Sequence, residues 1–330
     1  MQNKTISFFL LGILLFVFSA CGSSKVAPPK KVETPKWVSI QPKDTSSFTY
    51  GLGIAKNREE ALTSALNDVV SKLGVKVESS FTNKQIVNGY YSKSISTNNI
   101  KADVAKIRVT NYQVEQSHRI SFREYAVLLK VDNKKFFNTL KQDIIRAKNT
   151  ISNSLQKANN LDAISRYKTK KAMSKACEKL LSNTLVAHEL NASFDKNSYF
   201  NFVANVKDSY YSEVNRLNFY VYGNANAQNF IALIKKELLE NGFNVSNKMK
   251  HNSLKVNLHA TDNIKINQKI VAIKLNIKVS DAGKTVGSNV LTMKERYKSS
   301  KSSIYSAAAV HFEQDLNTQG VEKILGIGIN

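Results

Sequence analysis

The pattern that most constrains this fold is a long stretch of helical periodicity in the middle of the chain. Over residues 134–215, apolar side chains recur every three or four positions, as they do on one face of an α-helix. We expect one helix before a turn at Asn159-Asn160, a second over Leu161–Leu190 and a third over Tyr199–Val214. On either side the sequence changes to short alternating segments, which are typical of strands. These features predict an α+β fold in which a long helical region separates two sheet-and-helix units.

The first unit is predicted over residues 37–133. Its opening segment, "TYGLGIA" (residues 49–55), has the character of a strand and leads directly into an amphipathic helix. Asn57 is placed to cap this helix, Glu60 completes a capping box, and Gly74 supplies a left-handed stop. The buried face of the helix is expected to contain Ala61, Leu62, Ala65, Leu66, Val69, Val70 and Leu73.

Three more strands are expected to complete the first unit. Alternation of apolar and polar residues predicts them over Val75–Phe81, Val104–Val114 and Ile120–Val131. Together with the opening strand and helix, they predict a sheet with a helix packed against it.

The last part of the chain, residues 216–330, begins in a similar way. The segment "NFYVYG" over Asn218–Gly223 ends in Tyr-Gly, as the first unit does at Tyr50-Gly51, and Asn226 is placed to cap a helix that Gly242 ends. Strands are expected over Leu254–Leu258, Val271–Val279 and Val286–Met293, with a turn at residues 281–284 and a closing helix from Ser303. This unit is either a divergent repeat of the first or an independent unit whose matches are coincidental.

The first 20 residues have the features of a signal peptide. An apolar run over Ile6–Phe18 is followed by the small residues Ser19 and Ala20 and then by Cys21. This order resembles a bacterial lipobox, with Phe at the position where Leu is usual, and it predicts cleavage before Cys21 and acylation of that cysteine, for example with palmitate. The alternative is an ordinary cleaved signal followed by an incidental cysteine.

Residues 21–36 are predicted to form a polar, lipidated tether. The segment contains Pro28, Pro29 and Pro35 and almost nothing that could be buried. Gly22, rather than Asp, follows the cysteine, and in the sorting pattern of lipoproteins this resembles an outer-membrane destination. We therefore expect a lipid anchor in the outer membrane, on either its periplasmic or its surface face.

The formal net charge of +23 invites an anionic partner. However, the chain contains 40 Lys and only 8 Arg, whereas surfaces that read phosphates favour the arginine fork. The positive charge is also spread along the whole mature chain. We therefore interpret it mainly as a solubilising surface, expect no nucleic acid, and keep anionic envelope polymers as a secondary hypothesis.

The best local candidate for a polyanion-binding patch is the run "RYKTKKAMSKACEK" in the second predicted helix. Lys168, Lys171, Lys175 and Lys179 fall on one face of this helix. The opposite face carries Met173, Cys177, Leu180 and Leu181. This layout favours a solvated face over a buried one, and docking of a polyanion on the four lysines is the alternative.

No pattern in the sequence points to catalysis or to a cofactor. Gly51-Leu52-Gly53 precedes a helix, but Lys56 stands where a dinucleotide site needs a third glycine, and no Walker loop occurs. We interpret the glycines as a means of packing a strand tightly beside a helix. The five histidines are isolated in the sequence, and Cys177 fits a buried thiol. We expect no catalytic residue, no metal, no cofactor and no small-molecule substrate.

Two segments resemble a known lipoprotein family. They are "PKWVSIQP" and "YGLGIAKNREEALTSALNDVVSKLGVKVESS". The residues that carry the resemblance are Pro35, Trp37, Tyr50, Gly51, Gly53, Ala55, Ala61, Ala65, Val77 and Ser79. Over about residues 35–131 the chain is similar to the twenty-kilodalton outer-membrane lipoprotein antigen (Lpp-twenty) family, and flagellar assembly proteins of the FlgT and FlgP kind look similar in the same domain. The resemblance implies a part in envelope rings or disks, and it carries over no catalytic residue.

These observations predict a non-enzymatic outer-membrane lipoprotein that acts as an envelope or flagellum-associated scaffold. Its expected partners are the membrane, through the N-terminal lipid, and envelope or flagellar proteins, among them further copies of itself. Two alternatives stay open: a tethered activator of a peptidoglycan synthase, and a surface protein that binds anionic polymers. An enzymatic function would require a cleft in which polar groups converge around the histidines.

Overall fold

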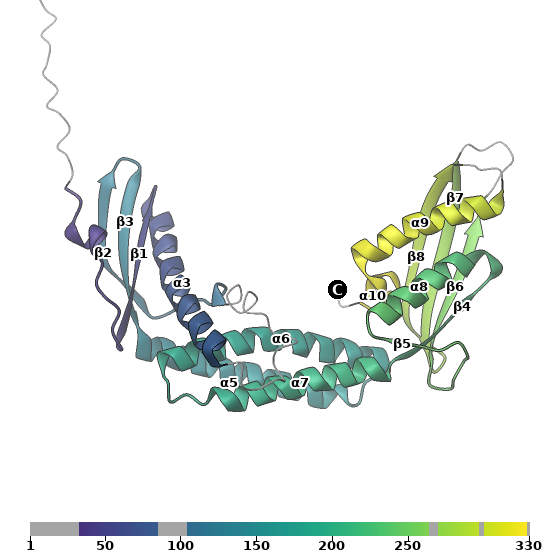
Figure 1. Cartoon of the computed structure of the whole chain (residues 1–330), viewed down its shortest axis with the longest axis horizontal. Helices are drawn as coiled ribbons and strands as arrows, with labels where there is room; N and C mark the ends of the chain where they lie inside the picture. Colours follow the sequence, from purple (N-terminus) through teal and green to yellow (C-terminus); the bar gives the residue numbers. More distant parts are fainter. Residues whose placement is uncertain (1–32, 85–103, 264–269, 297–299, 329–330) are drawn as a thin grey trace, which may run out of the picture.

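The computed structural model describes residues 33–84, 104–263, 270–296 and 300–328. Two sheet-and-helix units lie at opposite ends of a bundle of three long helices (Figure 1). The first unit holds a three-stranded sheet and the second a five-stranded sheet. The predicted α+β class, with two such units separated by a helical region, is confirmed. Residues 1–32, which include Cys21 and most of the predicted tether, lie outside the described part.

The first unit consists of one helix packed on one face of a small antiparallel sheet. Its elements are α2 (Lys36–Ser39), β1 (Phe48–Ala55), α3 (Arg58–Lys84), β2 (Tyr112–Ser121) and β3 (Glu124–Asp132). The strand order is β1-β3-β2, with both pairs antiparallel. The predicted cap is confirmed, since Asn57 Oδ1 accepts a hydrogen bond from the Glu60 backbone N–H at 2.9 Å, and the Glu60 side chain accepts one from the Asn57 side-chain amide at 2.8 Å. The α3 face that packs on the sheet is built from small residues, Ala61 and Ala65.

Helix α3 is longer than the sequence predicts. It runs through Gly74 to Lys84, so the predicted stop at Gly74 and the predicted strand over Val75–Phe81 are wrong. The reason is tertiary packing. Leu73 and Val77 extend the apolar stripe of the helix and are buried against the central bundle, and this burial outweighs the weak helix propensity of one glycine.

The remaining strands of the first unit begin and end elsewhere than predicted. Strand β2 starts only at Tyr112, because the apolar residues of the preceding segment are buried in the core of the central bundle and belong to no strand there. These residues are Val104, Ile107 and Val109. The predicted single strand over Ile120–Val131 is two strands, joined by a hairpin turn at Phe122-Arg123. The alternation of apolar and polar residues runs through the two-residue turn, so the sequence pattern does not reveal where one strand ends and the next begins.

The central bundle contains three helices close to their predicted positions. They are α5 (Asn133–Ala158), α6 (Ala163–Leu190) and α7 (Lys196–Arg216). Each starts at an aspartate whose side chain accepts backbone N–H hydrogen bonds from the first turn, namely Asp132, Asp162 and Asp195. Such caps satisfy N–H groups that have no partner within the helix. The sequence places the start of the third helix three residues late, because Asp195 was not read as its cap.

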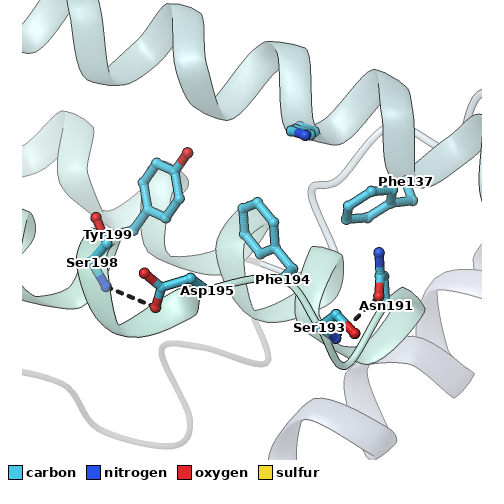
Figure 2. A pocket seen from close by; sticks show the side chains of 8 residues that line it. Phe137, Asn191, Ser193, Phe194, Asp195, Ser198 and Tyr199 are labelled. Atoms are coloured by element: carbon cyan, nitrogen blue, oxygen red, sulfur yellow. Dashed lines mark hydrogen bonds between the residues drawn. The ribbon is translucent and has the colours of Figure 1, made fainter.

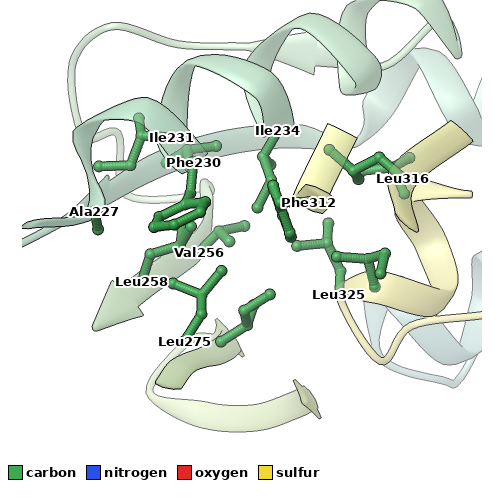
Figure 3. Close-up of a cluster of buried hydrophobic side chains, with 14 of the residues drawn as sticks. Ala227, Phe230, Ile231, Ile234, Val256, Leu258, Leu275, Phe312, Leu316 and Leu325 are labelled. Atoms are coloured by element: carbon green, nitrogen blue, oxygen red, sulfur yellow. The ribbon is translucent and has the colours of Figure 1, made fainter. Parts of the chain in front are cut away.

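The second unit is a five-stranded sheet covered on one face by helices. Its elements are β4 (Asn218–Gly223), the 3₁₀ turn η3 (Ala225–Ala227), α8 (Gln228–Glu240), β5 (Asn244–Val245), β6 (Leu254–Asp262), β7 (Ile270–Asp281), β8 (Lys284–Arg296), α9 (Lys301–Gln319) and α10 (Val321–Ile324). The strand order is β5-β4-β6-β7-β8. Strand β4 is parallel to both of its neighbours, and the other pairs are antiparallel. Figure 3 shows the core between the sheet and helices α8 and α9, in which Phe230 and Phe312 meet edge to face.

The two units share only their opening. In each, a strand that contains glycine is followed by a helix that packs on the sheet. The first strand then pairs antiparallel in the first unit and parallel in the second. Gly242 ends α8 with a φ of +79°, as predicted. Asn226 does not cap that helix, because η3 precedes α8 and the Asn226 amide instead donates to the Ala260 carbonyl at 3.4 Å.

Candidate functional site

Gly51 and Gly53 lie within β1, and the space where their side chains would stand is filled by the backbone of α3. A Cβ added at Gly51 would lie 2.3 Å from the Ala65 carbonyl oxygen, and one at Gly53 would lie 2.0 Å from that of Ala61. The N–H of Leu52, between them, donates to Asp68 on α3 at 3.0 Å. These contacts are those of a strand packed against a helix, and they support the interpretation of the glycines as a packing device.

Among the described residues, no group of three histidine, cysteine or carboxylate side chains is placed to hold a metal ion. The five histidines, His118, His188, His251, His259 and His311, are distributed over different elements. His188 contacts the Phe194 carbonyl through Nδ1 at 3.0 Å, and His311 contacts Glu295 at 2.6 Å. Cys177 is fully buried, and burial raises the pKa of its thiol to about 11, so this thiol is not poised as a nucleophile.

The four lysines predicted on one face of α6 do not act alike. Lys175 and Lys179 are exposed, and Lys168 is half-buried. Lys171 forms an ion pair with Glu322 of α10, so it holds the second unit against the bundle. The exposed part of the predicted polyanion patch therefore contracts to Lys175 and Lys179.

A buried ionic cluster that the sequence analysis missed lies near the N-terminal end of α6. Glu213 of α7 is 0% exposed, and it accepts hydrogen bonds from Arg166 Nε at 2.6 Å and from Lys170 Nζ at 2.8 Å. Burial alone would raise the pKa of the Glu213 carboxyl. The hydrogen bonds and positive charges of Lys170 and Arg166 outweigh burial, and the pKa is lowered. The one feature of the sequence that could have indicated this cluster is an acidic residue, Glu213, at a position on the buried face of α7.

The same end of α6 enters the core of the second unit. Tyr167 is 0% exposed, its ring lies 5.6 Å from that of Phe243, and its hydroxyl donates to Glu322 at 2.7 Å. Burial, together with the hydrogen bond to Glu322, raises the pKa of the Tyr167 hydroxyl far above its ordinary value. Ile164 joins the same hydrophobic cluster. The second unit is thus joined to the bundle by a continuous apolar core and by fully paired polar groups.

A second joint connects the first unit to the opposite end of the bundle. Val69, Leu73 and Val77 of α3 belong to one hydrophobic cluster with Phe136 and Leu140 of α5. The loop before β2 contributes Val104, Ile107 and Val109 to the same cluster. Each sheet-and-helix unit therefore shares a core with the bundle, and neither is connected to it by a flexible linker.

An open hollow of about 360 Å³ lies between α5 and the loop that joins α6 to α7 (Figure 2). Phe194 is stacked on Tyr199 at 5.3 Å and meets Phe137 edge to face at 5.7 Å. The remaining lining residues are Lys141, Asn191, Ser193, Asp195 and Ser198. Burial, with the nearby Asp195 charge, raises the pKa of Tyr199. The lining combines aromatic rings with polar side chains and contains no paired nucleophile and base.

No helix in the described part of the chain combines the length and the apolar character needed to cross a membrane. The predicted acylation site, Cys21, lies outside the described residues.

Comparison with known proteins gives little further information. No protein-family model and no curated protein matches the chain. A secreted protein from Helicobacter pylori, solved by crystallography, is 12% identical with a TM-score of 0.49, over 85% of this chain and 99% of the other. A minor lipoprotein from Acinetobacter baumannii is 15% identical with a TM-score of 0.27, over 33% of this chain and 94% of the other. Both scores are low, and the function therefore has to be argued from the residues of this chain.

Proposed function

We propose that this protein is a non-enzymatic lipoprotein of the outer membrane that acts as a scaffold. Its bundle holds two interaction units at a fixed separation within an envelope or flagellum-associated assembly. The observation that carries the proposal is the pair of continuous cores that join the bundle to both units. A flexible linker would let the two units move independently, whereas a shared core resists such motion.

The dimensions of the bundle suit a spacer. Helix α6 has 28 residues, which corresponds to a length of about 42 Å at 1.5 Å per residue. The Glu213 cluster and the pair between Tyr167 and Glu322 fix one end of this helix against its neighbours. Paired groups of this kind favour one arrangement of the elements over others, since any shift leaves a buried charge unpaired.

Lipid attachment is tested by following Cys21 in cells. Full-length protein grown with labelled palmitate should carry the label and fractionate with the outer membrane. Cys21→Ala should lose both properties while remaining folded. A mature N-terminus that begins elsewhere than Cys21, or that carries no acyl group, would show that the anchor is absent.

The scaffold role is tested by photo-crosslinking in living cells. Crosslinking residues are placed one at a time at exposed sites on the first unit, such as Thr63, and on the second, such as Gln314. The proposal expects defined adducts from both units, with different partner surfaces or with further copies of the chain. If neither unit yields a defined adduct in anchored, folded protein, the scaffold role is wrong.

A further inference from the structure

The five-stranded sheet of the second unit has one face that no described element covers. Helices α8 and α9 pack on the other face, where the apolar residues of the strands form the core (Figure 3). The residues that alternate with these core positions form what we call the open face. Its members are Asn218, Tyr220, Tyr222, Lys255, Asn257, His259, Thr261, Ile270, Ala272, Lys274, Asn276, Lys278, Ser280, Ser288, Val290, Thr292, Lys294 and Arg296.

The open face carries cations without carboxylates. Five of its members are basic: Lys255, Lys274, Lys278, Lys294 and Arg296. The acidic residues of the same strands are engaged elsewhere. Glu295 is buried opposite Val271, on the covered side. Asp262 accepts a hydrogen bond from Tyr305 of α9 and pairs with Lys301. Asp281 stands at the β7–β8 hairpin turn.

This charge distribution works against the stability of the sheet. Like charges on neighbouring strand positions repel one another, and sheets ordinarily intersperse charges of both signs. For none of these five side chains does the described part of the chain provide an acidic partner within ion-pair distance. A bound polyanion would supply the missing negative charge.

Two tyrosines at one end of the open face add a second kind of contact. The rings of Tyr220 and Tyr222 on β4 are nearly parallel, with an interplanar angle of 21° and centroids 5.4 Å apart. The strand register places Tyr220 beside Lys255, and Tyr222 beside Asn257. Aromatic rings next to amides and amines suit ligands that present both flat apolar faces and polar groups.

The spacing of the basic residues suits a polymer rather than a single small ion. Lys274 and Lys278 are four residues apart on β7 and so stand about 13 Å apart on the same face. Lys278 on β7 lies beside Asn257 on β6, which in turn lies beside Tyr222 on β4. A cation, an amide and an aromatic ring therefore form one row across the sheet. A row of this kind can contact an extended polymer whose charged groups recur at regular spacing.

We propose that the open face binds a linear anionic saccharide polymer, whose carboxylate or phosphate groups contact the lysines and whose sugar rings pack on Tyr220 and Tyr222. The choice of a saccharide over a nucleic acid rests on the proposed envelope location. Lysine also predominates over arginine on this face. Lysine makes single contacts with separate negative charges, whereas arginine is the residue that binds a phosphate through two hydrogen bonds at once.

The test uses the mature chain, residues 22–330, without lipid. Binding is measured at low and moderate salt by fluorescence anisotropy with labelled polygalacturonate, heparin, neutral dextran and single-stranded DNA. The proposal expects the two anionic saccharides to bind and dextran not to bind. The double variant Lys274→Gln/Lys278→Gln should bind them about tenfold more weakly, since two cationic contacts are lost. Tyr222→Ala should weaken binding with little change in its salt dependence.

The matched control is Lys175→Gln/Lys179→Gln on α6, which removes the same charge from an exposed helical face. It should leave saccharide binding within about twofold of the unaltered chain, because salt-dependent affinity follows the charges in contact with the polymer. Equal losses in both double variants would overturn the proposal in favour of non-specific charge. Absence of binding to both anionic saccharides, or tighter binding of DNA, would also overturn it. Circular dichroism melting verifies that each variant is folded. These outcomes do not depend on Cys21 acylation, so they separate this proposal from the proposed anchor.

Discussion

At the scale of single residues, Gly53 in β1 and Gly74 in α3 differ in whether the structure has room for a Cβ atom. Gly53 faces the α3 backbone, with the Ala61 oxygen where a Cβ would stand. Gly74 lies within α3, and a Cβ there would come no closer than 3.7 Å to Val104. The first position cannot accept a methyl group without moving the helix, and the second can.

We therefore expect Gly53→Ala to destabilise the first unit by about 3 kcal/mol, because it overpacks a backbone contact. Gly74→Ala is the matched control, and it should stabilise by about 0.5–1 kcal/mol because alanine favours a helix over glycine. Urea unfolding followed by circular dichroism measures both. An unchanged midpoint for Gly53→Ala would show that β1 and α3 are not packed as described.

Glu213 is the residue whose charge matters most to the bundle. Its carboxylate is paired with Arg166 and Lys170 while fully buried. Removing one partner of such a cluster leaves the others buried without compensation, which costs about 3–5 kcal/mol. We expect Glu213→Gln to lower the midpoint of unfolding substantially.

The pH dependence of stability provides a separate prediction for Glu213. Its pKa in the folded state is lowered from the ordinary value of 4.5, so the unfolded chain binds this proton more readily. The contribution to stability is present above pH 4.5 and is lost as the pH falls through the folded pKa. Glu213→Gln should remove this acid loss. The control is Glu313→Gln on the exposed face of α9, which should leave the loss intact. An acid profile unchanged by Glu213→Gln would contradict the pairing.

At the scale of elements, the sequence predicts the helices and helix ends that depend on neighbouring residues in the chain. The three bundle helices follow from periodicity, and Gly242 marks the end of α8. The continuation of α3 beyond Gly74 was missed because it depends on the burial of Leu73 and Val77 in one cluster with residues of α5 and α6, which lie far away in the sequence. The Glu213 cluster was missed for the same reason, since its partners are 43 and 47 residues away. The alternation along β6 and β7 also predicts which of their residues form the open face. The prediction from sequence used only the apolar residues that face the core.

Strands β2 and β3 provide a prediction at this scale. Strand β3 pairs on both sides and is buried at Ala126–Leu129 and Val131, whereas β2 is an exposed edge among the described elements. Backbone amides of β3 should exchange with solvent far more slowly than those of β2, because buried and doubly paired strands open least often. Hydrogen exchange followed by mass spectrometry measures both strands. Slow exchange of β2 that disappears on dilution would indicate that a second copy of the chain covers this edge.

At the scale of the whole molecule, the arrangement of the units depends on the two joints. Both joints are continuous hydrophobic clusters, and the Glu213 cluster and the pair between Lys171 and Glu322 lie at the joint between the bundle and the second unit. Because of these joints, we expect the two sheet-and-helix units and the bundle to move as one rigid body in solution. Relative motion is the ordinary expectation for units joined by small polar contacts, and a shared apolar core removes it.

Distance measurement between the units tests this rigidity. Spin labels on Thr63→Cys and Gln314→Cys report from opposite units, and the buried Cys177 stays unlabelled in the chain of residues 22–330. Double electron–electron resonance should give one narrow distance distribution for this pair. Adding Glu213→Gln should broaden it, because the end of the bundle next to the second unit then holds two cations without their anion, whereas adding Glu313→Gln should not. A broad distribution in the absence of either glutamate substitution would mean that the units move independently, and the spacer role would then lose its physical basis.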